Sequence, residues 1–175
     1  QEPSYFIALA NLIGEKRTRR KDARILFEQA LSMNADDPNT LGAFAIFLEE
    51  KIKDYPAAEE MYLRGVRAAP HDSSILYNFA SFLETRNKDY ALADDYYQRA
   101  LEEAPNDTVI NDAYADFLHK KMKNKKLATR HRLIAEGAHA SGPADGGSGS
   151  SDDEKSLMSD TASVASSVPE SVDSG

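Results

Sequence analysis

The amino-acid sequence predicts an all-α fold, a right-handed α-solenoid of about four antiparallel helix pairs over residues 1–140. Two observations support this prediction. The sequence aligns with itself when it is shifted by 35 residues. Within each shifted unit, the apolar residues recur with the spacing of an amphipathic helix. Repeats of this length are typical of stacked helical units, because one unit alone cannot bury its apolar face.

The self-alignment brings residues of the same kind into columns. The large apolar columns are Phe27, Tyr62 and Tyr97; Phe44, Phe79 and Tyr114; and Phe47, Phe82 and Phe117. The small-residue columns include Ala45, Ala80 and Ala115, and also Ala30, Gly65 and Ala100. We expect the aromatic side chains to fill the space between units and the small ones to let helices approach closely.

Each unit contains two helical patterns. In the first pattern of the third unit, Leu76, Phe79, Ala80 and Leu83 follow the spacing 0, 3, 4, 7, which places them on one helix face. A second amphipathic pattern follows in each unit. The predicted helices are 4–15 and 20–33, 39–50 and 55–68, 73–85 and 90–103, and 108–121 and 126–138.

Local signals mark where these helices begin and end. Asp72 and Asp107 stand just before predicted helices, where a carboxylate can accept hydrogen bonds from unpaired N–H groups. Pro70 and Pro105 close two units, because proline cannot continue a helix that needs its N–H. In the fourth unit Arg132 replaces the aromatic residue of the second helix. That change suits a terminal repeat, whose outer face meets water.

Charge divides the chain into a body and a tail. The 175 residues have a net charge of −8, of which residues 1–140 contribute −2 and residues 141–175 contribute −6. A nearly neutral body offers no general electrostatic attraction to nucleic acid. The last 35 residues are acidic and serine-rich with few apolar side chains, which predicts a disordered tail. Within it, Ser151 precedes Glu154 by three residues, a pattern that resembles an acidophilic kinase site.

The sequence has no cysteine, so disulfides and thiolate metal sites are excluded. No apolar segment approaches the roughly 20 residues that span a bilayer. We therefore expect no membrane span and a cytoplasmic location, with the nucleus as an alternative. Because the chain starts at Gln1, we also expect it to belong to a larger chain or complex.

The columns resemble the tetratricopeptide repeat (TPR) motif. The residues that match it are Leu76, Phe79, Ala80 and Leu83 in a first helix, then Ala93, Tyr97, Ala100 and Pro105 in a second helix and its end. Three features depart from the motif. The period is 35 residues where TPR units have about 34, so we expect one extra residue in the turn between helices. The early tryptophan is absent, and Ala35 replaces the first closing proline. HAT repeats and pentatricopeptide repeats are the alternative families.

The resemblance implies a protein–protein interaction scaffold or adaptor that binds a partner segment in a concave groove lined by the first helices. The predicted groove residues are Ile7, Asn11, Ile46, Tyr77, Asn78, Ser81, Asp112 and Asp116. The cations with which chaperone-binding TPR domains hold a carboxylate are missing from these columns. Because acidic residues lie toward the C-terminal end of the groove, we expect a protein or peptide partner with basic and apolar residues.

Three other interpretations stay open. The groove residues could simply be the solvent-facing positions of each helix. The chain could be a HAT-like structural subunit of an RNA-processing assembly, or a segment that caps or spaces a larger protein's repeats. Basic residues cluster at 16–21 and 120–132, and we expect them to be solvated turn charges. No aromatic side chains accompany these clusters as stacking platforms, so specific nucleic-acid binding is not predicted.

The sequence shows no catalytic motif, and we expect no enzyme activity, metal site or cofactor. The four histidines are scattered and form no known ligand or nucleophile–base pattern. The acidic pairs Glu59-Glu60 and Asp94-Asp95 are expected on the outward faces of second helices, where they would be solvated.

Overall fold

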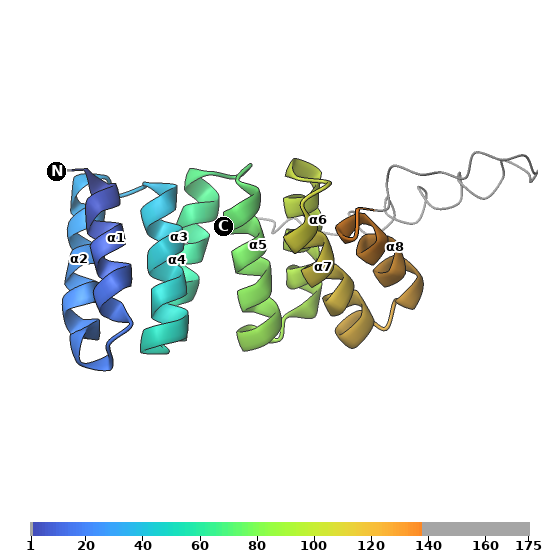
Figure 1. The fold of residues 1–175 in the computed structure, drawn as a ribbon, viewed down its shortest axis with the longest axis horizontal. Helices are drawn as coiled ribbons and strands as arrows, with labels where there is room; N and C mark the ends of the chain where they lie inside the picture. The colour runs from blue at the N-terminus through green and yellow to red at the C-terminus, as the bar shows by residue number, and fades with distance from the viewer. Residues whose placement is uncertain (1, 138–175) are drawn as a thin grey trace, which may run out of the picture. The chain divides into compact units, whose positions relative to one another are not determined.

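The computed structural model describes residues 2–137, which form four antiparallel helix pairs. The first helices are α1 (Pro3–Gly14), α3 (Pro38–Phe47), α5 (Ser73–Phe82) and α7 (Thr108–Phe117). The second helices are α2 (Arg20–Met33), α4 (Tyr55–Ala68), α6 (Tyr90–Glu103) and α8 (Lys125–Ala135). Figure 1 shows the pairs following one another in chain order. The predicted all-α solenoid is confirmed for these residues.

A π-helical turn follows three of the first helices, where the sequence predicted a plain helix end. These turns are η2 (Leu48–Ile52), η3 (Leu83–Asn87) and η4 (Leu118–Met122). A π turn holds one more residue than an α turn. The extra residue of the 35-residue period is therefore accommodated in the last turn of the first helix, before the chain reverses. In the first pair a short 3₁₀ turn, η1 (Arg17–Arg19), makes the connection.

Each π turn ends at a lysine in the left-handed conformation. Lys53, Lys88 and Lys123 have φ values of 68°, 57° and 60°. This conformation reverses the chain and lets a later N–H reach a free carbonyl, as when Asp54 N–H donates to the Leu48 carbonyl at 3.0 Å. Glycine adopts this left-handed conformation without steric strain, whereas the Cβ atom of lysine makes it unfavourable.

Six of the eight α-helices begin with a side-chain cap, which an aspartate or asparagine just before the helix provides. The predicted cap Asp72 accepts hydrogen bonds from the Ser74 and Ile75 N–H groups, and Asp107 accepts equivalent bonds from Val109 and Ile110. The second helices α4, α6 and α8 are capped by Asp54, Asp89 and Asn124 respectively. In the recurring pairs Asp54-Tyr55 and Asp89-Tyr90, the aspartate is therefore the N-cap and the tyrosine is the first residue of the helix.

Aromatic triads form the core between consecutive pairs. At each junction, the aromatic ring of one second helix packs against two rings of the following first helix. The centroid distances are 5.0 and 5.2 Å from Phe27 to Phe44 and Phe47, 5.7 and 5.3 Å from Tyr62 to Phe79 and Phe82, and 5.5 and 5.3 Å from Tyr97 to Tyr114 and Phe117. All nine rings are buried. The predicted role of the aromatic columns is confirmed.

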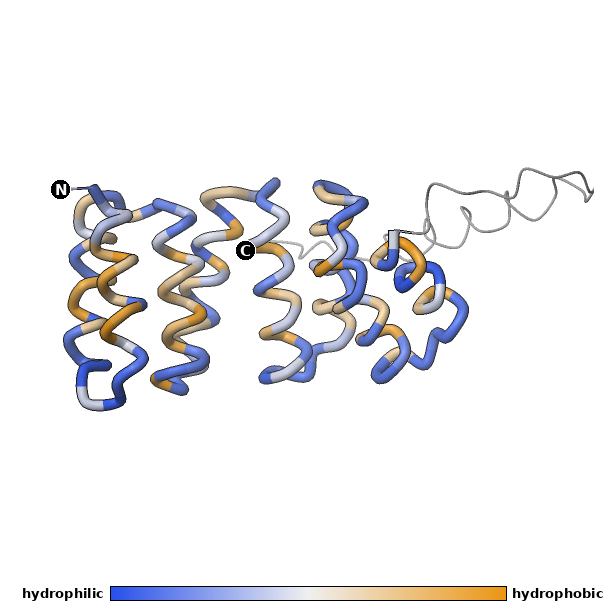
Figure 2. Tube along the Cα trace, viewed as in Figure 1, coloured by the Kyte–Doolittle hydropathy of each residue, from blue (hydrophilic) through white to orange (hydrophobic). Residues whose placement is uncertain are grey.

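Small residues permit the close contact between pairs. At Gly65 on α4, an added Cβ would lie 2.0 Å from Ile75 Cδ1 of α5, so the glycine leaves the space that Ile75 occupies. The corresponding alanines, Ala30 and Ala100, are fully buried. In Figure 2 hydrophobic and hydrophilic residues alternate along most helices, as expected when one face of each helix packs inward.

The predicted acidic tail, residues 141–175, lies outside the described residues. Within residues 2–137, no helix has the length and apolar character needed to cross a membrane.

Candidate functional site

The first helices of the first three pairs lie side by side in the stack. α1 contacts α3, and α3 contacts α5. The second helices α2, α4 and α6 instead contact the first helix of the next pair. A partner segment lying along the first-helix layer would therefore meet side chains from several units in succession.

Each first helix presents a stripe of side chains that the core leaves partly uncovered. On α5 and its π turn this stripe contains Tyr77, Asn78, Ser81 and Glu84, which are all half-buried between fully buried neighbours. The corresponding residues are Ile7, Ala8 and Asn11 on α1; Gly42, Ala43, Ile46 and Glu49 on α3 and η2; and Asp112, Ala113, Asp116 and His119 on α7 and η4. We call this set the first-helix stripe. All eight predicted groove residues belong to it.

The middle of the stripe is apolar. Ile46 and Tyr77 are half-buried and pack against the core, as Ile7 does on α1. The Tyr77 ring lies 6.2 Å from the ring of Tyr97 on α6. Burial raises the pKa of the Tyr77 hydroxyl, and the charges of Asp107 and Glu84 raise it further. Tyr77 is therefore an uncharged aromatic side chain that packs against Tyr97 and is partly exposed to solvent.

Two glutamates of the stripe are fixed by tyrosines beneath them. The Tyr62 hydroxyl donates to Glu49 at 3.1 Å, and the Tyr97 hydroxyl donates to Glu84 at 3.0 Å. Arg86 also donates to Glu49, at 3.0 Å, and so links the second and third units. The sequence analysis did not identify these bonds. Their signal is a tyrosine 13 residues after a glutamate in two successive units.

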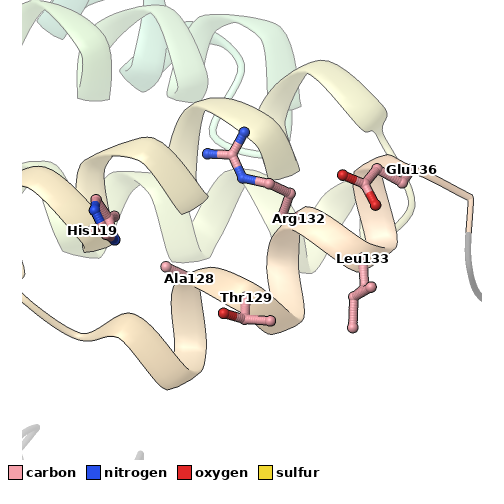
Figure 3. Close-up of a pocket in the computed structure, with 6 residues that line it drawn as sticks. All are labelled: His119, Ala128, Thr129, Arg132, Leu133 and Glu136. Carbon is pink, nitrogen blue, oxygen red and sulfur yellow. The ribbon is translucent and has the colours of Figure 1, made fainter.

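Arg132 changes the character of the acidic end of the stripe. Its guanidinium donates to Asp112 at 2.9 Å and to Asp116 at 2.5 Å. Figure 3 shows Arg132 extending from α8 across the adjoining helix. Hydrogen bonds from Lys120 and Arg132 lower the pKa of the Asp116 carboxyl. Asp116 is therefore ionised, and Arg132 pairs with both aspartates within the domain.

Asp94 corrects the prediction for the outward acidic pairs. The Tyr114 hydroxyl donates to Asp94 at 2.8 Å, and Asp94 is half-buried. Glu59 likewise accepts a hydrogen bond from Asn87 of the next unit, at 2.9 Å. These carboxylates connect consecutive pairs, whereas Glu60 and Asp95 are exposed as expected. The pattern of charges alone does not show which carboxylate lies under the next unit's side chains.

No family model and no curated protein matches the sequence. Among solved structures, PilF of Pseudomonas aeruginosa superposes with a TM-score of 0.67 at 20% identity, over 81% of this chain and 63% of that one. MamA of Desulfovibrio magneticus RS-1 superposes with a TM-score of 0.63 at 17% identity, over 80% and 78%. MamA of MSR-1 gives 0.54 at 17% identity, over 67% and 66%. The match thus spans just under two thirds of the PilF and MSR-1 MamA chains.

PilF and MamA are both TPR-repeat proteins. The fold of this chain is TPR-like. Because the sequence identities are below 25%, the superpositions establish the arrangement of the helices only. They say nothing about the role of the residues in the first-helix stripe.

Three hollows of the TPR-like domain lie away from the eight predicted groove residues. One of about 470 Å³ adjoins Arg64 and Arg67, one of about 240 Å³ lies beside His119 and Leu133, and one of about 350 Å³ lies beside Leu9 and Leu26. None of these three is lined by a predicted groove residue. Within the described residues, no group of three or more histidine or acidic side chains is arranged to hold a metal ion.

Proposed function

We propose that this TPR-like domain is a non-enzymatic scaffold that binds an extended or helical segment of a partner protein along the first-helix stripe. The observation that supports it best is the pair of half-buried apolar side chains, Ile46 and Tyr77, on the first helices of the two central units. Partly exposed aromatic and aliphatic groups in successive units are suitable anchors, because such groups dominate binding energy at protein interfaces.

The anchors are held in place before a partner arrives. Tyr77 rests beside Tyr97, and Tyr97 is fixed by its hydrogen bond to Glu84. A side chain that is already ordered loses little conformational entropy on binding, which leaves more of the contact energy for affinity. The central units, rather than the first or last, therefore provide the main binding surface in this proposal.

The charge of the stripe selects the partner. Glu84 Oε2 accepts the Tyr97 bond, and no partner for Glu84 Oε1 is found within residues 2–137. A lysine or arginine of the segment can pair with this oxygen while an apolar neighbour covers Tyr77. Asp112 and Asp116 contribute less than the sequence suggests, because Arg132 already binds them. We infer a segment with apolar residues flanking one basic residue.

A role as a structural subunit of an RNA-processing assembly is the alternative, and the TPR-repeat matches do not favour it. The two functions differ in their response to salt. Binding to nucleic-acid phosphates weakens steeply as salt is added, whereas contact with Ile46 and Tyr77 changes little.

Site-specific photocrosslinking tests the proposal. A benzophenone amino acid is placed at Tyr77 in the full chain, or at Leu92, an exposed apolar residue of α6 that lies outside the stripe. A partner should crosslink from position 77 and not from position 92, and excess salt should not abolish it. Equal crosslinking from both positions, or crosslinking to RNA from position 77, would contradict the proposal.

A further inference from the structure

The charges of the four units are divided between two edges of the stack. In Figure 1 the turn inside each pair lies at the lower edge, and the connections between pairs lie at the upper edge. We call the four turns the turn edge; it consists of residues 15–22, 50–57, 85–92 and 120–127. These residues include 14 lysines and arginines against five aspartates and glutamates. The connections, residues 33–40, 68–75 and 103–110, include five acidic residues and no lysine or arginine.

More than half of the cations on the turn edge make no contact that the fold uses. Within residues 2–137, eight of the 14 make no ion pair, cation–π contact or side-chain hydrogen bond. All but one of these eight are exposed, and the buried Nε atom of the exception, Arg20, has no hydrogen-bond partner. The eight are Lys16, Arg17, Arg20, Lys21, Lys53, Lys88, Lys125 and Lys126.

The first and fourth turns place cations where helix stability gains nothing from them. Residues 20–21 begin α2 and residues 125–126 begin α8, and all four are lysine or arginine. The N-terminal end of a helix carries a partial positive charge, so cations are unfavourable there. The central second helices begin with Tyr55-Pro56 and Tyr90-Ala91 instead. The lysines in the π turns differ, because they lie near helix C-termini, where the dipole favours them.

The fourth turn combines this positive charge with an exposed apolar side chain. Every residue from Lys120 to Lys126 is exposed, and Met122, which is 43% exposed, lies among five lysines. Its counterpart in the second unit, Ile52, packs against the core. An anionic bilayer offers headgroups to the lysines and apolar chains to the methionine, whereas an acidic peptide or a nucleic-acid backbone offers charge alone. The combination therefore favours a lipid surface.

We propose that the turn edge, and above all residues 120–126, is a docking surface for an anionic lipid bilayer. The lysines and arginines approach the headgroups, and Met122 enters the interface between headgroups and acyl chains. Because the chain has a net charge of −8, the attraction depends on the concentration of cations along this one edge. The turn edge shares no residue with the first-helix stripe, so lipid and partner protein can be bound at the same time.

Vesicle co-sedimentation of the full chain tests this proposal. Vesicles of phosphatidylcholine alone are compared with vesicles that also contain about 30% phosphatidylserine. The chain should sediment with the phosphatidylserine vesicles only, and added salt should weaken this binding, since salt screens the attraction between exposed charges. Equal binding to both kinds of vesicle, or to neither, would overturn the proposal.

Two matched charge reversals locate the binding surface. Lys126→Glu should weaken binding to phosphatidylserine vesicles at least tenfold, because it replaces an attractive charge with a repulsive one. The control is Arg67→Glu, which makes the same change of charge at an exposed residue in the last turn of α4, at the opposite edge. It should leave binding within twofold. Lys126→Glu should not lower the melting temperature, because a carboxylate suits the first turn of α8. Equal loss of binding in both variants would contradict the assignment.

Met122→Ser separates a lipid surface from other polyanions. It should weaken binding to phosphatidylserine vesicles at least threefold, because the methionine no longer enters the bilayer interface. Polyglutamate and an RNA oligonucleotide serve as competitors, at a concentration of negative charge equal to that of the vesicles. Tighter binding of either competitor than of the vesicles, with Met122→Ser having no effect, would assign the turn edge to an acidic protein or a nucleic acid and overturn the proposal.

Discussion

The Tyr97 hydroxyl donates a hydrogen bond to the Glu84 carboxylate at 3.0 Å, and the Tyr62 hydroxyl makes the same bond to Glu49, 35 residues earlier in the chain. In both units the tyrosine ring is buried in an aromatic triad, while the glutamate belongs to the first-helix stripe. One bond therefore joins the core between two pairs to the candidate binding surface. The first and last units lack it, because Phe27 and Arg132 occupy the tyrosine position.

The two parts of Tyr97 can be separated by substitution. Tyr97→Ala should destabilise the domain by roughly 3–5 kcal/mol, because it removes the central ring of a triad. Tyr97→Phe keeps the ring and should lose about 1–2 kcal/mol, since Glu84 remains half-buried without its donor. Urea denaturation followed by circular dichroism would measure both. If the two variants were equally stable, the ring could not be packed as described.

Alkaline pH should destabilise the domain through its buried tyrosines. Burial, reinforced by Glu49, Glu84 and Asp94, raises the pKa values of Tyr62, Tyr97 and Tyr114 above their ordinary 10.0. In the folded state these hydroxyls keep their protons, whereas in the unfolded chain they lose them above pH 10. Their contribution to stability is therefore complete below pH 10 and is lost as the pH rises further. From pH 10 to 11 the loss should be roughly 1 kcal/mol per tyrosine.

Denaturation curves at pH 9, 10 and 11 would measure this dependence. The double variant Tyr62→Phe with Tyr97→Phe should lose stability over the same interval with about a third of the wild-type slope, since one of the three buried hydroxyls remains. An identical slope in the two proteins would show that these hydroxyls titrate normally in the folded state.

The left-handed lysines offer a stabilising substitution. Lys88 is exposed and has a φ of 57°. Lys88→Gly should stabilise the domain by about 0.5–1 kcal/mol, because glycine adopts this conformation without a steric penalty. Lys88→Ala is the control: it removes the charge but keeps the Cβ, so its stability should stay close to wild type. Thermal unfolding of both variants would settle the point, and a destabilised glycine variant would argue against the π turn.

The sequence was sufficient for features that depend on residues close together or on the repeat itself. Caps such as Asp72 act within one helical turn, and the aromatic columns follow directly from the 35-residue alignment. The π turns were not predicted, because the apolar spacing up to Leu83 is the same for a plain helix. The additional residue was expected in the connecting turn instead.

The positions of the candidate site residues could be predicted from the sequence, but their hydrogen bonds and ion pairs could not. The stripe positions follow from the repeat, since each lies at a fixed offset from a buried aromatic residue. Their interactions depend on residues that differ between units. Arg132 was recognised as a lost aromatic residue, but its bonds to Asp112 and Asp116 require the packing of α8 against α7. The exposure of Leu12, whose repeat counterpart Phe47 is buried, was likewise not predicted from the sequence.

The most direct test of partner binding along the first-helix stripe is the affinity of the segment crosslinked at position 77 for three proteins. These are the wild-type chain, the Tyr77→Ala variant and the Leu92→Ala control, each titrated at low and at moderate salt. We predict that Tyr77→Ala weakens binding by at least tenfold at both salt concentrations, as expected for a central anchor worth more than about 1.4 kcal/mol. Leu92→Ala should bind as wild type. Equal affinities for all three proteins, with binding that disappears as salt is added, would contradict the proposal.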